Sequence, residues 1–61
     1  MKVREIIKII ENDGWYLKRA KRSHRQFKHP IKNGTVTIAG HERDTIHPKT
    51  ESSILKQARL K

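Results

Sequence analysis

The chain has 61 residues and no cysteine, so a fold of this size must be held together by apolar packing. A domain this small buries only about 60% of the surface that its unfolded chain exposes. Disulfides and thiolate metal sites, which stabilise many small domains, are excluded without cysteine. We therefore expect one domain over residues 1–61, in which helices pack closely on a sheet.

Two segments have the pattern of helices. Near the N-terminus, apolar residues recur at the spacing of one helical face: Val3, Ile6, Ile7 and Ile10. This spacing predicts a helix over residues 3–12, and the turn residues up to Gly14 end it. A second helix is predicted from about Lys49 to Arg59, because Pro48 and Glu51 suit the start of a helix.

Between the helices, alternating residues and turn signals predict three strands, over residues 15–20, 23–29 and 35–39. Lys21-Arg22 forms the first turn, and the second contains Asn33-Gly34, which accepts positive φ readily. The order α-β-β-β-α indicates an α+β fold, a three-stranded antiparallel sheet with both helices on one face. The expected core consists of Ile6, Ile7, Ile10, Leu17, Phe27, Val36, Ile38, Ile54 and Leu55. Trp15 is expected in the core too, whereas Tyr16 suits base stacking and the core equally well.

The charge of the chain indicates an anionic partner. Fifteen Lys and Arg residues against six Asp and Glu give a net charge of +9. The mean hydropathy of −0.91 leaves no segment long and apolar enough to span a bilayer. The cations cluster in the middle of the chain instead of along one helical face, which favours nucleic acid over a membrane surface. The N-terminus lacks an apolar signal core, so we expect a cytoplasmic protein.

His24 lies in the densest run of positive charge, from Lys18 to His29. Histidine has an ordinary pKa of about 6.5, so it exchanges protons near neutral pH. Metal-free RNA cleavage needs a base for the 2′-hydroxyl proton and cations for the charge that develops on the phosphate. His24 is the candidate base, and an exposed histidine without function is the plain alternative. The residues expected to bind RNA are Lys18, Lys21, Arg22, Ser23, Arg25 and Lys28.

The other histidines offer neither a metal site nor an obvious proton donor. His29 lies five residues after His24 and is expected to face the opposite side of the strand. His41 and His47 fall in a polar loop, where each is a weak candidate for RNA contact. The four histidines do not have a zinc-binding spacing, so we expect no metal and no cofactor.

An ordered set of segments resembles the HicA-type toxins of bacterial and archaeal toxin–antitoxin pairs. These segments are Asp13-Gly14-Trp15, Ser23-His24-Arg25-Gln26-Phe27, His29-Pro30, Thr35-Val36-Thr37-Ile38 and Ser53-Ile54-Leu55-Lys56-Gln57-Ala58. The resemblance covers essentially the whole chain and implies a fold similar to the double-stranded RNA-binding domain. It implies a type II toxin that cleaves mRNA without the ribosome, with a single catalytic histidine at the position of His24. It also implies a HicB-type antitoxin that covers this site.

The sequence departs from the family pattern in three places. Arg22 stands where the family usually has glycine before Ser-His, so its side chain alters the turn, crowds the phosphate or adds a cation. Ala39-Gly40-His41 replaces a segment that often reads Pro-His. Arg59 replaces the glycine that commonly follows Gln-Ala, which predicts a helix that runs slightly further.

Three functions remain open from the sequence alone. The first is a metal-independent endoribonuclease toxin, monomeric when free, that is inhibited by its antitoxin. The second is a non-catalytic RNA-binding module with the same basic face. The third is a structural protein whose charge serves only to bind an acidic antitoxin, with no affinity for RNA.

Overall fold

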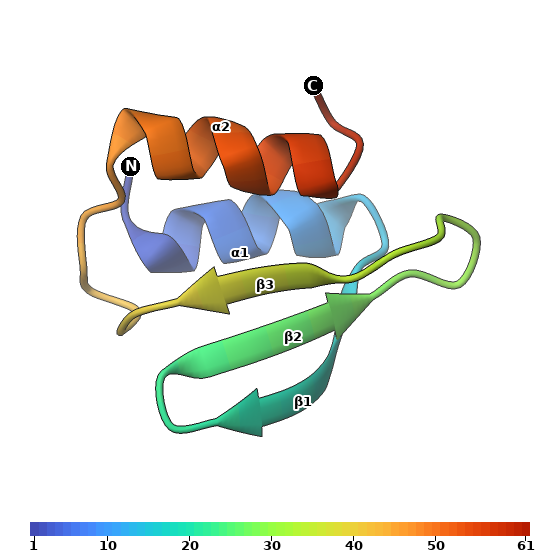
Figure 1. Ribbon diagram of the computed structural model, residues 1–61, viewed down its shortest axis with the longest axis horizontal. Helices are drawn as coiled ribbons and strands as arrows, with labels where there is room; N and C mark the ends of the chain where they lie inside the picture. Colours follow the sequence, from blue (N-terminus) through green and yellow to red (C-terminus); the bar gives the residue numbers. More distant parts are fainter.

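The computed structural model describes residues 1–61 and has the predicted order of elements. Along the chain, one helix precedes the three strands and one follows them, as Figure 1 shows. The elements are α1 (Val3–Asn12), β1 (Tyr16–Lys21), β2 (His24–Lys28), β3 (Val36–Ala39) and α2 (Pro48–Gln57).

The three strands form one antiparallel sheet in the order β1-β2-β3, and both helices lie on one face of it. The predicted α+β fold, like that of the double-stranded RNA-binding domain, is thereby confirmed. In Figure 1 the helices lie beside β3, whereas β1 lies at the opposite edge of the sheet. All six residues of β1 are exposed. The helices therefore cover β2 and β3 but leave β1 open to solvent.

The N-terminal end of α1 is fixed by the loop that precedes α2. The backbone N–H groups of Val3 and Arg4 donate to the carbonyls of Asp44 and Glu42, at 2.9 and 3.1 Å. The carboxylate of Glu5 accepts the N–H of Lys2 at 3.0 Å. These bonds satisfy donors that the first turn of a helix otherwise leaves free.

The core lies between the helices and the inner face of β2 and β3. Its ten buried residues are Val3, Ile6, Ile10, Trp15, Phe27, Val36, Ile38, Ile46, Ile54 and Ala58. Trp15 is buried as predicted, and Ile7 and Leu55 pack on the core while partly exposed. The prediction for Leu17 is wrong, because half of its surface is exposed. Leu17 pairs with the buried Phe27, but no helix reaches over β1 to cover it.

A cluster of polar contacts joins the C-terminal end of α1 to α2. His29 Nε2 lies 2.7 Å from the carbonyl oxygen of Asp13, and its Nδ1 accepts two backbone N–H groups, each at 3.0 Å. This pattern makes Nε2 the protonated nitrogen of the ring. Lys32 donates to the Asp13 carboxylate and, at 3.3 Å, to the carbonyl of Ala58. The His29 ring also packs edge-on against Trp15. His29 therefore has a structural role.

The Asp13–Lys32 contact predicts a pH-dependent contribution to stability. The hydrogen bond from Lys32 lowers the pKa of Asp13 below its ordinary value of 3.8. A carboxyl group with a lowered folded-state pKa stabilises the protein above its unfolded pKa and loses this effect as pH falls through the folded value. We expect Asp13→Asn to lower the melting temperature at neutral pH, and we expect this difference to shrink only as pH falls below about 4 through the lowered folded-state pKa. A difference that is constant over thermal melts from neutral to acid pH would contradict this account.

The turn between β1 and β2 consists of Arg22 and Ser23, one residue later than predicted. Arg22 has a φ of 57°, a conformation that glycine adopts without strain and other residues adopt at a cost. This explains why a glycine suits the position. The second connection, over residues 29–35, is a longer loop than a tight Asn-Gly hairpin.

The helix α2 ends earlier than predicted. Gln57 is its last residue, and Ala58 forms the cap. Arg59 then adopts a left-handed φ of 58°. The N–H of Leu60 donates to the carbonyl of Leu55 at 2.8 Å, and the N–H of Arg59 to that of Lys56 at 3.0 Å. This is the double hydrogen bond of a Schellman cap, which forms here despite the missing glycine. The expectation of a longer helix is wrong.

We expect Arg59→Gly to raise the free energy of unfolding by about 0.5–1 kcal/mol. The left-handed conformation costs a non-glycine residue about 1–2 kcal/mol, and the extra freedom of glycine in the unfolded chain offsets part of the gain. Chemical denaturation measures the difference. As a control, Lys56→Gly inside the same helix should destabilise by about 1 kcal/mol. If Arg59→Gly destabilised the protein as much as Lys56→Gly, the backbone at Arg59 would not be strained and this account would be wrong.

Candidate active site

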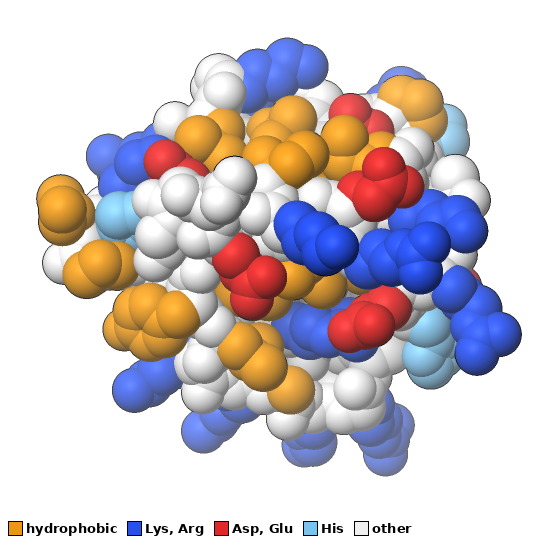
Figure 2. Space-filling view, turned by 180° about the vertical axis from the view of Figure 1, so that it is seen from behind, with side chains coloured by type: hydrophobic (Ala, Val, Ile, Leu, Met, Phe, Trp, Pro, Cys, Tyr) orange, Lys and Arg blue, Asp and Glu red, His pale blue; other side chains and the backbone are white.

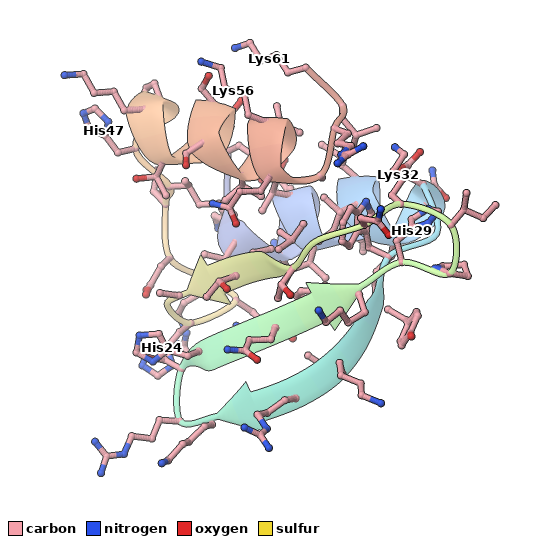
Figure 3. All side chains as sticks on the ribbon, turned by 45° about the vertical axis from the view of Figure 1, so that its right-hand side comes forward. His24, His29, Lys32, His47, Lys56 and Lys61 are labelled. Atoms are coloured by element: carbon pink, nitrogen blue, oxygen red, sulfur yellow. The ribbon has the colours of Figure 1, made fainter.

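His24 is the first residue of β2 and follows the turn directly. Side chains alternate between the faces of a strand, and the odd-numbered neighbours Arg25 and Phe27 lie on the helix side. His24 therefore points away from the helices, where it is exposed. Neither of its ring nitrogens makes a hydrogen bond within the protein. Figure 3 shows His24 at one end of β2 and His29 beyond the other end.

An irregularity in β1 decides which cations share the face of His24. Leu17 pairs with Phe27 and Arg19 with Gln26, so Lys18 is an extra residue, as in a β-bulge. The bulge reverses the alternation of β1 after Leu17. As a result, Arg19 and Lys21 lie on the outer face, and Lys21 is the direct cross-strand partner of His24.

These residues surround a hollow on the outer face of the sheet, which we call the His24 hollow. It has a volume of about 450 Å³ and is lined by Arg19, Lys21, Arg22, His24, Gln26 and Thr37. No carboxylate lines it, and none of its cations forms an ion pair within the protein. Figure 2 shows many Lys and Arg side chains along the lower edge of the molecule, where β1 lies. The hollow thus offers an unsatisfied positive potential beside an exposed imidazole, which suits a phosphate group.

The residues predicted to bind RNA divide between the two faces of the sheet. Lys21 and Arg22 line the His24 hollow. Lys28 pairs with Tyr16 on the same outer face, further along β2. Arg25 faces the helix side, where its Nη1 donates to the carbonyl of Gly40 at 2.9 Å. Lys18 lies at the bulge and Ser23 in the turn, and RNA contact by either stays a prediction.

Three lining residues were missed from the sequence: Arg19, Gln26 and Thr37. Gln26 was accessible to prediction, because it is two residues from His24 on the same strand. Thr37 required the register of β3, in which it pairs with Gln26. Arg19 was hidden by the bulge, since simple alternation places Lys18 on the outer face instead.

The remaining histidines lie outside the His24 hollow. His47 caps α2, because its Nδ1 accepts the backbone N–H of Lys49 at 3.1 Å. His41 lies in the loop between β3 and α2. No three His, Asp or Glu side chains come together as ligands for a metal ion.

Comparison with known proteins gives a family to which the chain is similar. The family model for the HicA toxin of bacterial toxin–antitoxin systems matches residues 3–60. A search of curated proteins gave no match. Neither helix has the length and apolar character that crossing a membrane requires.

Proposed function

The chain belongs to the HicA toxin family of bacterial toxin–antitoxin systems, and on this premise we propose that it is an mRNA endoribonuclease whose single catalytic histidine is His24. One observation carries the proposal. An exposed imidazole with two unbonded ring nitrogens lies in a hollow lined by three cations and no carboxylate. This is the combination of base and charge stabilisation that cleavage next to a 2′-hydroxyl requires.

The proposed reaction needs no group beyond the RNA, water and these side chains. His24 takes the proton of the 2′-hydroxyl, and the 2′ oxygen attacks the adjacent phosphorus. The bond from phosphorus to the 5′ oxygen breaks, which leaves a 2′,3′-cyclic phosphate on one fragment. The released 5′ oxygen takes a proton from water, which reaches the open hollow. The hydroxide left behind takes the proton that His24 gained, so water and neutral His24 are both restored. Lys21 and Arg22 stabilise the negative charge that develops on the phosphoryl oxygens.

The partner of such a toxin is an antitoxin, and we propose a HicB-type protein that covers the His24 hollow. The net charge of +9 favours an acidic surface on this partner. Covering the hollow removes both the base and the cations from RNA. An mRNA-cleaving toxin of this kind would act in the cytoplasm.

Incubation of the purified chain with single-stranded RNA in the presence of EDTA tests the proposed activity. We expect cleavage that EDTA does not abolish, and growth arrest when the chain is expressed without its antitoxin. Intact RNA after incubation with folded protein would contradict the proposed nuclease activity.

An RNA-binding module without catalysis is the second candidate, and Arg22 favours it. Its side chain lines the His24 hollow where the family usually has glycine, so it competes for the space that a reacting phosphate needs. This candidate predicts RNA binding and growth arrest that His24→Ala leaves intact. Salt does not separate the candidates, because phosphate contacts make both kinds of binding salt-dependent.

A further inference from the structure

We propose that a second hollow, on the helix side of β2, binds the RNA backbone that continues from the His24 hollow. We call it the Arg25 hollow. It has a volume of about 800 Å³ and is lined by Arg4, Arg25, His41, Glu42, Arg43 and Asp44. The proposal rests on the proposed function, because it assigns this surface to the same RNA strand.

The two hollows are neighbours along the chain and lie on opposite sides of one strand. His24 and Arg25 are consecutive residues at the start of β2, so their side chains leave the strand on opposite faces. His24 lines the first hollow and Arg25 the second. The start of β2 therefore forms a ridge between the two hollows, one on each face of the sheet, and basic side chains line both.

The Arg25 hollow is built from segments that are tied to the turn before His24. The N–H of Gly40 donates to the carbonyl of Ser23 at 3.0 Å, and the guanidinium of Arg25 donates to the carbonyl of Gly40 at 2.9 Å. The N–H of His41 donates to the Asp44 carboxylate at 2.9 Å. The same loop caps α1 through its backbone carbonyls. Arg25 is thus held in place with further N–H donors available for an anion.

The charges of the Arg25 hollow leave its arginines free for a ligand. Neither Glu42 nor Asp44 forms an ion pair with Arg4, Arg25 or Arg43, because the ion pairs of the protein involve only Asp13. The Asp44 carboxylate instead accepts a backbone N–H. Three guanidinium groups therefore exceed two carboxylates in the same hollow. The loop between β3 and α2 lies at the right-hand end of the molecule in Figure 2. At that end, Lys and Arg side chains lie around acidic side chains and a histidine.

A strand of RNA fits this pair of hollows better than a small anion. Guanidinium groups bind phosphate oxygens bidentately, and consecutive phosphates allow one ligand to occupy both sides of the ridge. An isolated phosphate occupies only one hollow. A single strand is flexible enough to cross the end of the sheet, so the Arg25 hollow holds nucleotides next to the one that reacts at His24.

The double variant Arg4→Ala/Arg43→Ala tests the proposal, because both side chains are exposed and their removal leaves the core intact. We expect the KM for an oligoribonucleotide to rise about tenfold, while kcat and the cleavage of a dinucleotide stay unchanged. The control Lys49→Ala/Lys56→Ala removes the same charge from the surface of α2. An equal rise in KM for both double variants, or no rise for either, would overturn the proposal.

Binding of a 2′-O-methyl oligonucleotide keeps this test independent of catalysis, because it lacks the attacking hydroxyl. The slope of log affinity against log salt concentration changes by about 0.7 for each phosphate contact with a single strand. We expect the magnitude of this slope to fall by about 1.4 in Arg4→Ala/Arg43→Ala, which removes two phosphate contacts. We expect a smaller fall in Lys49→Ala/Lys56→Ala. If the chain binds this probe with the expected slopes but cuts no RNA, the proposed function fails while the second hollow stands.

Glu42→Gln is a complementary variant that removes a negative charge from the Arg25 hollow. We expect affinity for the same oligonucleotide to rise about two- to threefold. Glu11→Gln removes an identical charge from α1 outside both hollows and should have a smaller effect. Equal effects of the two variants would point to net charge alone and would overturn a localised site.

Discussion

Replacement of His24 by alanine is expected to lower the rate constant for RNA cleavage by a factor of about 10²–10⁴, with RNA affinity changed by about twofold or less. Proton transfer by a positioned side chain contributes an acceleration of this size. Affinity is retained because Arg19, Lys21 and Arg22 still line the hollow. Single-turnover kinetics with excess protein measure cleavage separately from binding.

Two further variants show whether the loss arises from proton transfer. His24→Gln keeps a polar side chain of similar reach but carries no titratable group, so it should be as inactive as His24→Ala. His47→Asn keeps a residue that caps helices well and removes a histidine outside the hollow, so its activity should match that of the parent chain. Substantial cleavage by His24→Gln would show that His24 acts by position instead of by taking a proton.

Phe27→Ala is expected to lower the free energy of unfolding by about 3–5 kcal/mol. Phe27 is 1% exposed and is the buried residue on the inner face of β2. A core as small as this one supplies only about 3–5 kcal/mol of net stability. The variant should therefore be largely unfolded at room temperature, as circular dichroism and chemical denaturation can establish.

Leu17→Ala is the matched control, because Leu17 lies directly opposite Phe27 in the sheet. Half of the Leu17 surface is exposed, so its truncation should cost less than about 1 kcal/mol. The pair tests whether the helices cover β2 without covering β1. Similar destabilisation by both variants would show that β1 is covered in solution.

The fold was predictable from the sequence wherever local pattern and tertiary packing agree. The apolar stripe of α1 identified the helix and its buried face, with Ile6 and Ile10 fully buried. Local pattern failed where a long-range relation decides the outcome. Leu17 has the alternating spacing of a core residue, but its burial depends on how far the helices extend across the sheet. Arg59 was expected to prolong α2, but the helix ends in a backbone cap at this position. A residue other than glycine can form this cap if it adopts the strained left-handed conformation.

The candidate site was predictable in part for the same reason. His24 stood out by its chemistry, and its outward direction follows from alternation with Phe27. The bulge at Lys18 was not visible in the sequence, and it brings Arg19 to the outer face. The position of Arg25 beside Gly40 required the register of β3 and the path of the loop that follows it.

Analysis of the ends of the cleaved RNA tests the role of His24 most directly. Attack by the 2′ oxygen must leave a 2′,3′-cyclic phosphate on one fragment and a 5′-hydroxyl on the other, and we expect both groups in the products formed with EDTA present. Fragments with 3′-hydroxyl and 5′-phosphate ends would show that water attacked the phosphate, and would contradict the mechanism built on His24.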